Sequence, residues 1–259
     1  MDTRGVMKKL FIILCFLAIP SLVFAGGITD KHKAVIARIN SAPVWATSVV
    51  FGWSGDMPQG TNYGFDSSGA PVAGVNSSLT IGTAYGESGS NGAHITNVDQ
   101  YLEFTGYIDD TSAQTIWMRI YVSDAVLDGE PTIFEAYVTG NDLIKIAFQT
   151  NLLVKGATIA QGNSADAREG AVANGSWIDI AYSWAGNNAG EGTPTGDHDI
   201  YYTAWKDSDA DELGYALSST PATFMLGEEL TAGTSPGDTE YINITQIAIV
   251  DGYKTAKPW

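Results

Sequence analysis

Gly175-Ser-Trp-Ile-Asp-Ile-Ala-Tyr-Ser-Trp184 alternates small or polar residues with bulky aromatic and β-branched ones. This alternation is typical of a strand in a pleated, half-buried sheet. A Gly-rich polar loop follows, and Asp199-Ile-Tyr-Tyr-Thr-Ala-Trp205 then predicts a second aromatic strand. Two such strands joined by a loop indicate a β-sheet as the basis of the fold.

The rest of the chain repeats this pattern, with short apolar runs separated by Gly, Asn, Asp and Ser. In Thr115-Ile-Trp-Met-Arg-Ile-Tyr-Val122, the aliphatic residues share one face, and Trp117, Arg119 and Tyr121 share the other. Residues 57–75 are rich in turn formers instead. About a dozen strands favour an all-β fold, a two-sheet antiparallel sandwich. The other expected strands are 47–53, 78–82, 101–104, 132–138, 143–149, 152–160, 222–226 and 241–250.

The N-terminal segment, residues 1–25, has the features of a signal peptide. Arg4, Lys8 and Lys9 form a positive n-region, and residues 10–24 form an apolar run. This run is short for a membrane span, although an uncleaved anchor helix is the alternative. We expect cleavage after residue 25 and a secreted protein, extracellular or periplasmic.

Residues 26–43 differ from the strands that follow. Thr29 and Asp30 are suitable caps for a short helix, which Pro43 would end. We therefore expect an N-terminal arm or short helix at 26–43. Residues 44–259 carry no internal repeat or linker, and we expect them to form a single β-sandwich domain.

The chain is strongly acidic, with 13 Lys and Arg against 29 Asp and Glu. Removal of the signal peptide, which holds three basic residues and one acidic residue, leaves 10 against 28, a net charge of −18. Nucleic acids and anionic membranes need a positive face, so neither is expected as a partner. Divalent cations, cationic partners and neutral glycans are compatible with this charge, and so is a role in solubility alone. The single cysteine, Cys15, lies in the signal peptide, so a disulfide-free core is expected.

Seven short segments follow one another along the chain in an order and with a spacing that indicate the fold. They are Val49 to Trp53, Asp66-Ser-Ser-Gly69, Leu102-Glu-Phe104, Ile116-Trp-Met118, Gly175 to Ala181, Phe224-Met-Leu-Gly227 and Ile244 to Ile249. Their order and spacing resemble the concanavalin A-like lectin and glucanase superfamily, in particular its laminin-G-like jelly-roll domain. The resemblance spans nearly all of residues 45–255 and implies a two-sheet jelly roll.

Two departures from the family pattern concern calcium and a hairpin. Thr245-Gln246 stands where the family often has acidic residues, which weakens a calcium site carried over to that position. A tight hairpin expected near Tyr202 is replaced by the longer segment Lys206-Asp-Ser-Asp-Ala-Asp-Glu-Leu-Gly214.

That acidic segment is a candidate calcium loop. Asp207, Asp209 and Asp211 alternate as in the first half of a calcium-binding loop, where hard oxygen ligands surround the cation. Glu212 and Ser218 stand where an EF-hand has Gly and Glu, so the segment is not an EF-hand. The alternative is a solvated hairpin tip.

Polar and aromatic residues on the strands are candidates for sugar binding, which needs flat aromatic surfaces and fixed polar groups. We expect Arg119 and Tyr121 to lie near Glu135 and Tyr137. The alternative is a structural ion pair between Arg119 and Glu135. We expect Trp117 and Trp177 to lie in the core. The candidate ligand-binding residues are Arg119, Tyr121, Glu135, Tyr137, Tyr201 and Trp205.

Three functions remain open from the sequence. The first is a secreted, non-catalytic, carbohydrate-binding protein with calcium as a candidate cofactor. The second is a structural or adhesive protein that binds another protein or itself. The third is a polysaccharide-cleaving enzyme, for which Glu103, Glu135 and Asp179 are the candidate carboxylates. The Glu-x-Asp-x-x-Glu motif of the family's glucanases does not occur, which makes the enzyme the least favoured.

Overall fold

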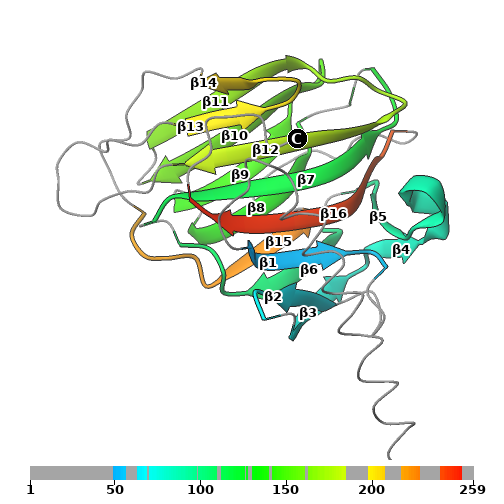
Figure 1. Cartoon of the computed structure of the whole chain (residues 1–259). Coiled ribbons are helices and arrows are strands. Elements are labelled where there is room, and N and C mark those ends of the chain that lie inside the picture. Colours follow the sequence, from blue (N-terminus) through cyan, green and yellow to red (C-terminus); the bar gives the residue numbers. More distant parts are fainter. Residues whose placement is uncertain are drawn as a thin grey trace, which may run out of the picture.

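The computed structural model describes residues 49–56, 63–68, 70–97, 99–109, 112–125, 127, 130–139, 142–160, 163–184, 198–207, 217–227 and 240–252. The regular structure in these segments is almost entirely β-strand, and the predicted all-β sandwich is confirmed (Figure 1). The predicted signal peptide, the N-terminal arm, Asp209 and Asp211 lie outside the described residues. No helix within the described segments is long and apolar enough to cross a membrane.

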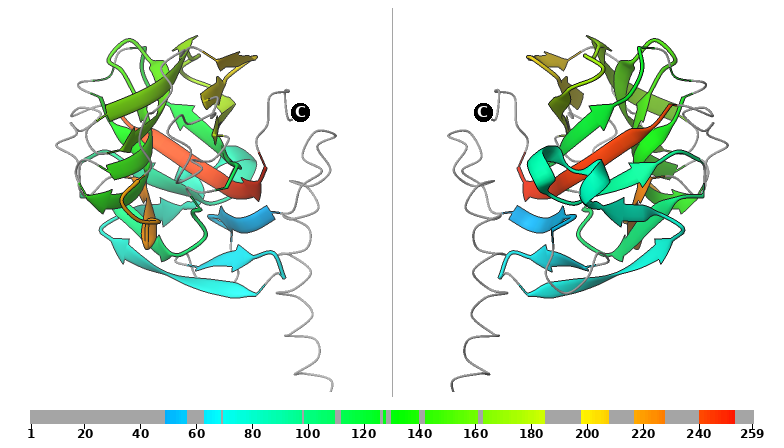
Figure 2. Two further views of the ribbon diagram at one scale, coloured as in Figure 1. Left: turned by 90° about the vertical axis from the view of Figure 1, so that its left-hand side faces the viewer. Right: turned by 90° about the vertical axis from the view of Figure 1, so that its right-hand side faces the viewer.

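The strands form two layers, which Figure 2 shows from the sides. Sheet A contains, in spatial order, β14 (Trp205–Asp207), β13 (His198–Tyr201), β12 (Trp177–Trp184), β7 (Gln114–Val122), β16 (Ile242–Asp251), β1 (Val49–Ser54) and β2 (Tyr63–Asp66), with β5 (Gly92–Ile95) and β4 (Thr80–Gly82) extending it beside β16. Sheet B contains β11 (Asn163–Ala171), β10 (Leu153–Ala160), β9 (Asp142–Phe148), β8 (Thr132–Thr139), β15 (Thr223–Gly227), β6 (Tyr101–Thr105) and β3 (Pro71–Ser77). All pairs between these strands are antiparallel.

The two sheets are continuous at one side of the sandwich. β2 pairs with β1 of sheet A, and β3 pairs with both β2 and β6 of sheet B. The turn-rich segment 57–75 therefore contributes to two strands, which the sequence did not indicate. Hydrogen-bonded pairing thus carries the chain from one layer to the other.

The core lies between the layers and is apolar. Phe51 of sheet A meets Phe104 and Phe224 of sheet B, with ring centroids 4.8 and 4.9 Å apart. Met118 and Ile120 of β7 are fully buried in the same cluster. Alternation along each strand then turns the intervening side chains away from the core, and these form the outer faces of the two sheets.

A polar bridge crosses the core near its other end. The Tyr182 hydroxyl lies 2.9 Å from Oγ1 of Thr158 on the facing sheet and 2.7 Å from Nδ1 of His198. Burial raises the pKa of Tyr182, so its phenol stays neutral. His198 is therefore a buried residue, only 3% exposed.

Candidate functional site

The candidate sugar-binding residues divide between opposite sides of the sandwich. Arg119 and Tyr121 of β7 lie on the outer face of sheet A, because Met118 and Ile120 face the core. Glu135 and Tyr137 of β8 belong to sheet B and point away from the core on its outer side. The expected proximity of these two pairs is therefore wrong, and so is the alternative ion pair between Arg119 and Glu135.

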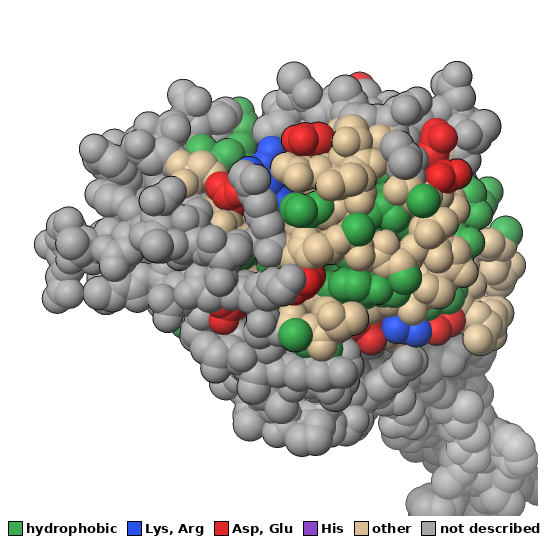
Figure 3. Space-filling view, turned by 90° about the horizontal axis from the view of Figure 1, so that it is seen from above, with side chains coloured by type: hydrophobic (Ala, Val, Ile, Leu, Met, Phe, Trp, Pro, Cys, Tyr) green, Lys and Arg blue, Asp and Glu red, His purple; other side chains and the backbone are tan. Residues whose placement is uncertain are grey.

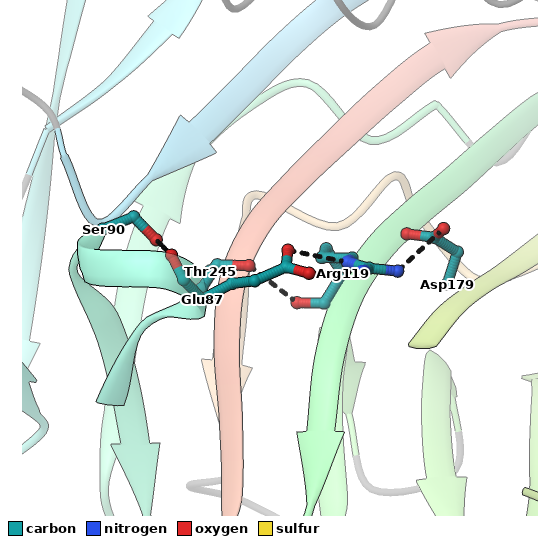
Figure 4. Close-up of polar contacts among 5 residues, drawn as sticks. All are labelled: Glu87, Ser90, Arg119, Asp179 and Thr245. Atoms are coloured by element: carbon teal, nitrogen blue, oxygen red, sulfur yellow. Dashed lines mark hydrogen bonds and ion pairs between the residues drawn. The ribbon is translucent and has the colours of Figure 1, made fainter. Parts of the chain in front are cut away.

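Arg119 instead forms ion pairs with two carboxylates on its own face, a group that we call the Arg119 cluster (Figure 4). Its Nε and Nη2 donate to Oε2 and Oε1 of Glu87 at 3.0 and 2.5 Å. Its Nη1 donates to Oδ2 of Asp179 at 3.1 Å. The hydrogen bond to Glu87 is the main cause that raises the pKa of Arg119, so the guanidinium stays charged. The three side chains are 21–28% exposed, which leaves their edges accessible to a ligand.

A row of five aromatic rings runs beside this cluster across sheet A. Successive ring centroids are 4.1, 4.9, 6.0 and 5.6 Å apart, and the rings belong to Tyr85, His94, Tyr241, Tyr121 and Trp177 in that order. We call these five residues the aromatic row. All five are half-buried, so each ring keeps an exposed part.

The aromatic row and the Arg119 cluster are neighbours by strand geometry. Trp177 and Asp179 are two residues apart on β12, as are Tyr121 and Arg119 on β7, and each step covers about 7 Å. Trp177 also pairs with Tyr121 across the strands, as Asp179 does with Arg119. Charged groups and rings therefore form two parallel lines on one surface.

The residues between β4 and β5 bring Tyr85 and Glu87 to this surface. They form two short 3-10 turns, Thr83–Tyr85 and Glu87–Gly89, joined by Gly86. A Cβ at Gly86 would overlap the carbonyl oxygen of Ser90, so only glycine allows the chain to fold back this closely. Ser90 closes the turn by donating through its Oγ to the Glu87 carbonyl at 2.7 Å.

One residue of this turn has an unusual backbone conformation. Ser88 has φ 51° and ψ 38°, in the left-handed region that serine rarely adopts. Residues held in such conformations concentrate at binding and catalytic sites. The turn is therefore a rigid support for Tyr85 and Glu87.

A bulge in β16 completes the surface. The register between β16 and β7 shifts between Ile244 and Gln246, so Thr245 is an additional residue opposite Arg119. The Thr245 hydroxyl donates to the Arg119 carbonyl oxygen at 3.4 Å. Beside the bulge, β1 ends and β5 begins along the same edge of β16.

A pocket of about 300 Å³ opens at this junction. Its lining consists of hydroxyl, carboxylate and amide side chains. They belong to Ser54, Asp56, Glu87, Ser88, Ser90, Thr245 and Gln246. Asp56 is held in place because its Oδ1 accepts a hydrogen bond from the Asn91 N–H at 2.6 Å. Such a lining presents hydrogen-bonding groups in fixed positions, next to the Arg119 cluster.

Among the remaining candidate residues, Tyr201 is not accessible to a ligand on this surface. Tyr201 is only 1% exposed. Trp205 and Asp207 lie in β14, where the structure describes the backbone and not the side chains. Within the described segments, no group of three or more His, Cys, Asp or Glu side chains is placed to hold a metal ion. The calcium loop at Asp207, Asp209 and Asp211 therefore stays a prediction.

Sequence reasoning missed several residues of this surface. Trp117 and Trp177 are half-buried on the outer face, so their expected place in the core is wrong. The period-two alternation already separated Trp117 from Ile116 and Met118 and was the correct signal. Tyr85, Glu87, His94, Tyr241 and Gln246 were not candidates, because loop folding and strand pairing bring them to the surface.

The carboxylates considered for catalysis are also separated. Glu103 and Glu135 both lie opposite Met225 on sheet B, on strands about 10 Å apart. Asp179 lies on the other sheet, in the Arg119 cluster. The three do not form one site.

Similar solved structures include binding domains of botulinum neurotoxins. A structure of botulinum neurotoxin type C, a toxin whose cell entry is dependent upon interaction with two ganglioside molecules, has a TM-score of 0.55 and 11% identity over 82% of this chain and 50% of that one. A second similar structure is the binding domain of a related toxin, botulinum neurotoxin DC, in complex with rat synaptotagmin II, and it has a TM-score of 0.55 and 11% identity over 81% and 49%. This chain thus spans about half of the length of each. No protein-family model matches the chain, and no curated protein matches its sequence. At these identities the likeness shows a shared β-sandwich, jelly-roll-like fold.

Proposed function

We propose that this protein is a secreted, non-catalytic, carbohydrate-binding β-sandwich of the concanavalin A-like type, which binds a glycan along the outer face of sheet A. The observation that carries this proposal is the aromatic row beside the Arg119 cluster and the polar pocket. Rings and fixed hydrogen-bonding groups occur together on this one surface.

Sugars need both kinds of group. The C–H faces of a pyranose ring pack against aromatic rings, and its hydroxyls need donors and acceptors in fixed positions. Tyr121 and Trp177 provide aromatic rings in the middle of the sheet, where pairing between β7 and β12 fixes their positions. The polar pocket provides hydrogen-bond donors and acceptors where β1 ends beside β16. An extended glycan crossing the strands would contact both.

The fold is compatible with this role, and with a protein partner as an alternative. Similar β-sandwiches belong to a neurotoxin that interacts with gangliosides and to one complexed with synaptotagmin. Fold likeness does not choose between ligands, because one scaffold hosts many functions. The sugar is favoured here by the continuous row of rings and by a polar pocket.

The carboxylates on this face are engaged in ion pairs, which favours binding of a glycan without its cleavage. Glu87 and Asp179 already accept hydrogen bonds from Arg119, which holds them as parts of an ion-pair cluster. Calcium enters the proposal as a candidate cofactor at Asp207, Asp209 and Asp211, through hard oxygen ligands.

The test is a glycan and polysaccharide binding array, run in calcium and again in EDTA. Tyr121→Ala and Trp177→Ala each remove one ring from the middle of the aromatic row, and we expect glycan binding to fall roughly tenfold or more. Tyr137→Ala is the matched control, because Tyr137 is also half-buried and lies on the outer face of sheet B.

Each outcome of the array has a meaning. Loss of binding with Tyr121→Ala and not with Tyr137→Ala supports the site. Equal loss in both, or none, contradicts it. Binding that survives EDTA removes calcium from the proposal and keeps the glycan. An array without any binding in either buffer contradicts the carbohydrate function and favours the protein partner.

A further inference from the structure

The distribution of charge at the site indicates which kind of glycan the site selects. The side chains that the structure describes include three Lys or Arg residues, namely Arg119, Lys145 and Lys155. Lys145 and Lys155 lie on β9 and β10 of sheet B. Arg119 is thus the one cation, among the described side chains, on the outer face of sheet A.

The charge of Arg119 is compensated by its two carboxylate partners. Its Nε, Nη1 and Nη2 each donate to a carboxylate oxygen at 2.5–3.1 Å. The two carboxylates outweigh the guanidinium, so the Arg119 cluster carries a formal charge of −1. Asp56 adds a further carboxylate to the pocket next to it. Figure 3, which views the molecule from above, shows the Lys and Arg side chains beside acidic ones.

This arrangement discriminates between ligands by their charge. A carboxylate on a glycan would meet acceptor oxygens of like charge, and like-charge contact suppresses the wrong partner. A neutral glycan brings hydroxyl donors, which form charge-assisted hydrogen bonds with the same carboxylates. The same groups therefore repel one class of glycan and bind the other.

We propose that Glu87 and Asp179 are specificity-determining residues, which mask Arg119 so that the site selects uncharged, hydroxyl-rich glycans and rejects carboxylated ones. This inference rests on the proposed carbohydrate function. It assigns Glu87 a role in ligand selection in addition to its contact with the pocket.

The test removes the mask and keeps its shape. The double variant Glu87→Gln with Asp179→Asn replaces both carboxylates by amides of the same size. Each amide oxygen can still accept one hydrogen bond from Arg119, and one of the two contacts with residue 87 is lost. Binding is then measured to glycan pairs that differ in charge: a glucan and the corresponding glucuronan, and a galactose-terminated and a sialylated oligosaccharide. Far-UV circular dichroism and thermal unfolding of each variant confirm that it is folded.

We expect the natural protein to prefer the neutral member of a pair. In the double variant, the ratio of carboxylated to neutral binding should rise roughly tenfold to a hundredfold, the effect of a hydrogen bond to a charged group. Added salt should weaken the gained binding, because it depends on charge. Asp179→Asn alone leaves both contacts with Glu87 and should give an intermediate shift, which keeps the test open if the double variant fails to fold.

Glu103→Gln is the matched control. It removes one negative charge, as Asp179→Asn does, from a half-buried position on the outer face of sheet B, and it should leave the ratio unchanged. A natural protein that prefers carboxylated glycans overturns the inference, and so does a folded double variant with an unaltered ratio, while the carbohydrate function stands in both cases. If neither protein binds any glycan, the proposed function itself is contradicted.

Discussion

On the outer face of sheet A the rings of Tyr121 and Trp177 stay half-exposed, whereas the outer face of sheet B buries its central side chains. On sheet A, Tyr121 and Trp177 sit in contact with each other and still reach the surface. On sheet B, Leu143 and Met225 are fully buried although neither belongs to the core between the sheets. Side chains buried in this way stabilise the folded chain, while accessible rings are available to a ligand. The comparison assigns structure to one face and binding to the other.

The ion pairs of the two faces also differ, in the number of contacts that each cation makes. On sheet B, Lys155 makes one contact with Asp166, at 3.2 Å. On sheet A, Arg119 engages two carboxylates through three nitrogen atoms. A planar guanidinium held in this way fixes the position of its partners, which an ammonium group with a single contact does not do. Substitutions on the two faces should therefore have unequal effects.

The largest effect is expected from a methyl group placed in the turn that supports the site. Gly86→Ala would push its Cβ into the Ser90 carbonyl oxygen, and the backbone must move to relieve it. We expect a loss of about 1–3 kcal/mol in the free energy of unfolding, together with weaker glycan binding, because Tyr85 and Glu87 move with the turn. Urea denaturation and the glycan array measure the two effects.

Gly170→Ala on β11 is the control for this substitution. A Cβ there meets nothing within 4 Å, so both stability and binding should be nearly unchanged. If Gly86→Ala behaves like Gly170→Ala, the turn adapts freely, and the rigid support assigned to it is wrong.

A smaller effect is expected when the cations of the two faces are removed. Arg119→Ala leaves Glu87 and Asp179 close together without their counter-charge and should cost about 1–2 kcal/mol, between the values for exposed and buried ion pairs. Lys155→Ala removes a single contact and should cost about 0.5 kcal/mol. The midpoint of urea unfolding measures both, provided that its slope is unchanged. Equal costs would contradict the difference between the two ion-pair arrangements.

Much of the fold could be predicted from residue alternation. The expected strand at 115–122 is confirmed as β7, and Gly175 to Trp184 is confirmed as β12. The strand β11 was missed, because Asn163–Ala171 contains mainly small and charged residues. It stands at an end of the strand order, where a strand needs little apolar surface.

The candidate site was harder to predict than the fold. Alternation correctly placed Arg119 and Tyr121 on one face, but it does not indicate which strands are neighbours. The contact between Arg119 and Glu87, 32 residues apart, depends on how Gly86 lets the turn fold back. The bulge at Thr245 is set by pairing with β7, which local sequence does not reveal. Tertiary packing, more than local propensity, assembles the surface.

The smallest effect is expected from pH, and it tests whether the aromatic row is a packed unit. Burial, followed by the neighbouring Tyr121, raises the pKa of Tyr241 above its usual value of about 10. The folded state then holds the phenol proton to higher pH than the unfolded state does. The contribution to stability is complete below pH 10 and is lost as pH rises through the pKa of the folded protein. Tyr241→Phe should therefore lose less stability above pH 10 than the natural protein.

The difference in alkaline stability loss between the natural protein and Tyr241→Phe reports on Tyr241 alone and not on the other tyrosines. The pKa values of Tyr107 and Tyr182 are also raised, mainly by burial, so part of the alkaline decline remains in the variant. Urea unfolding of both proteins in a pH series across this range measures the difference. Parallel curves would mean that Tyr241 ionises as in the unfolded chain, and that the row is open to water at this ring. A steeper alkaline loss of stability in the natural protein than in the variant would mean that Tyr241 is held among its neighbours in the folded protein. A ring held in place before a ligand arrives lowers the entropic cost of binding.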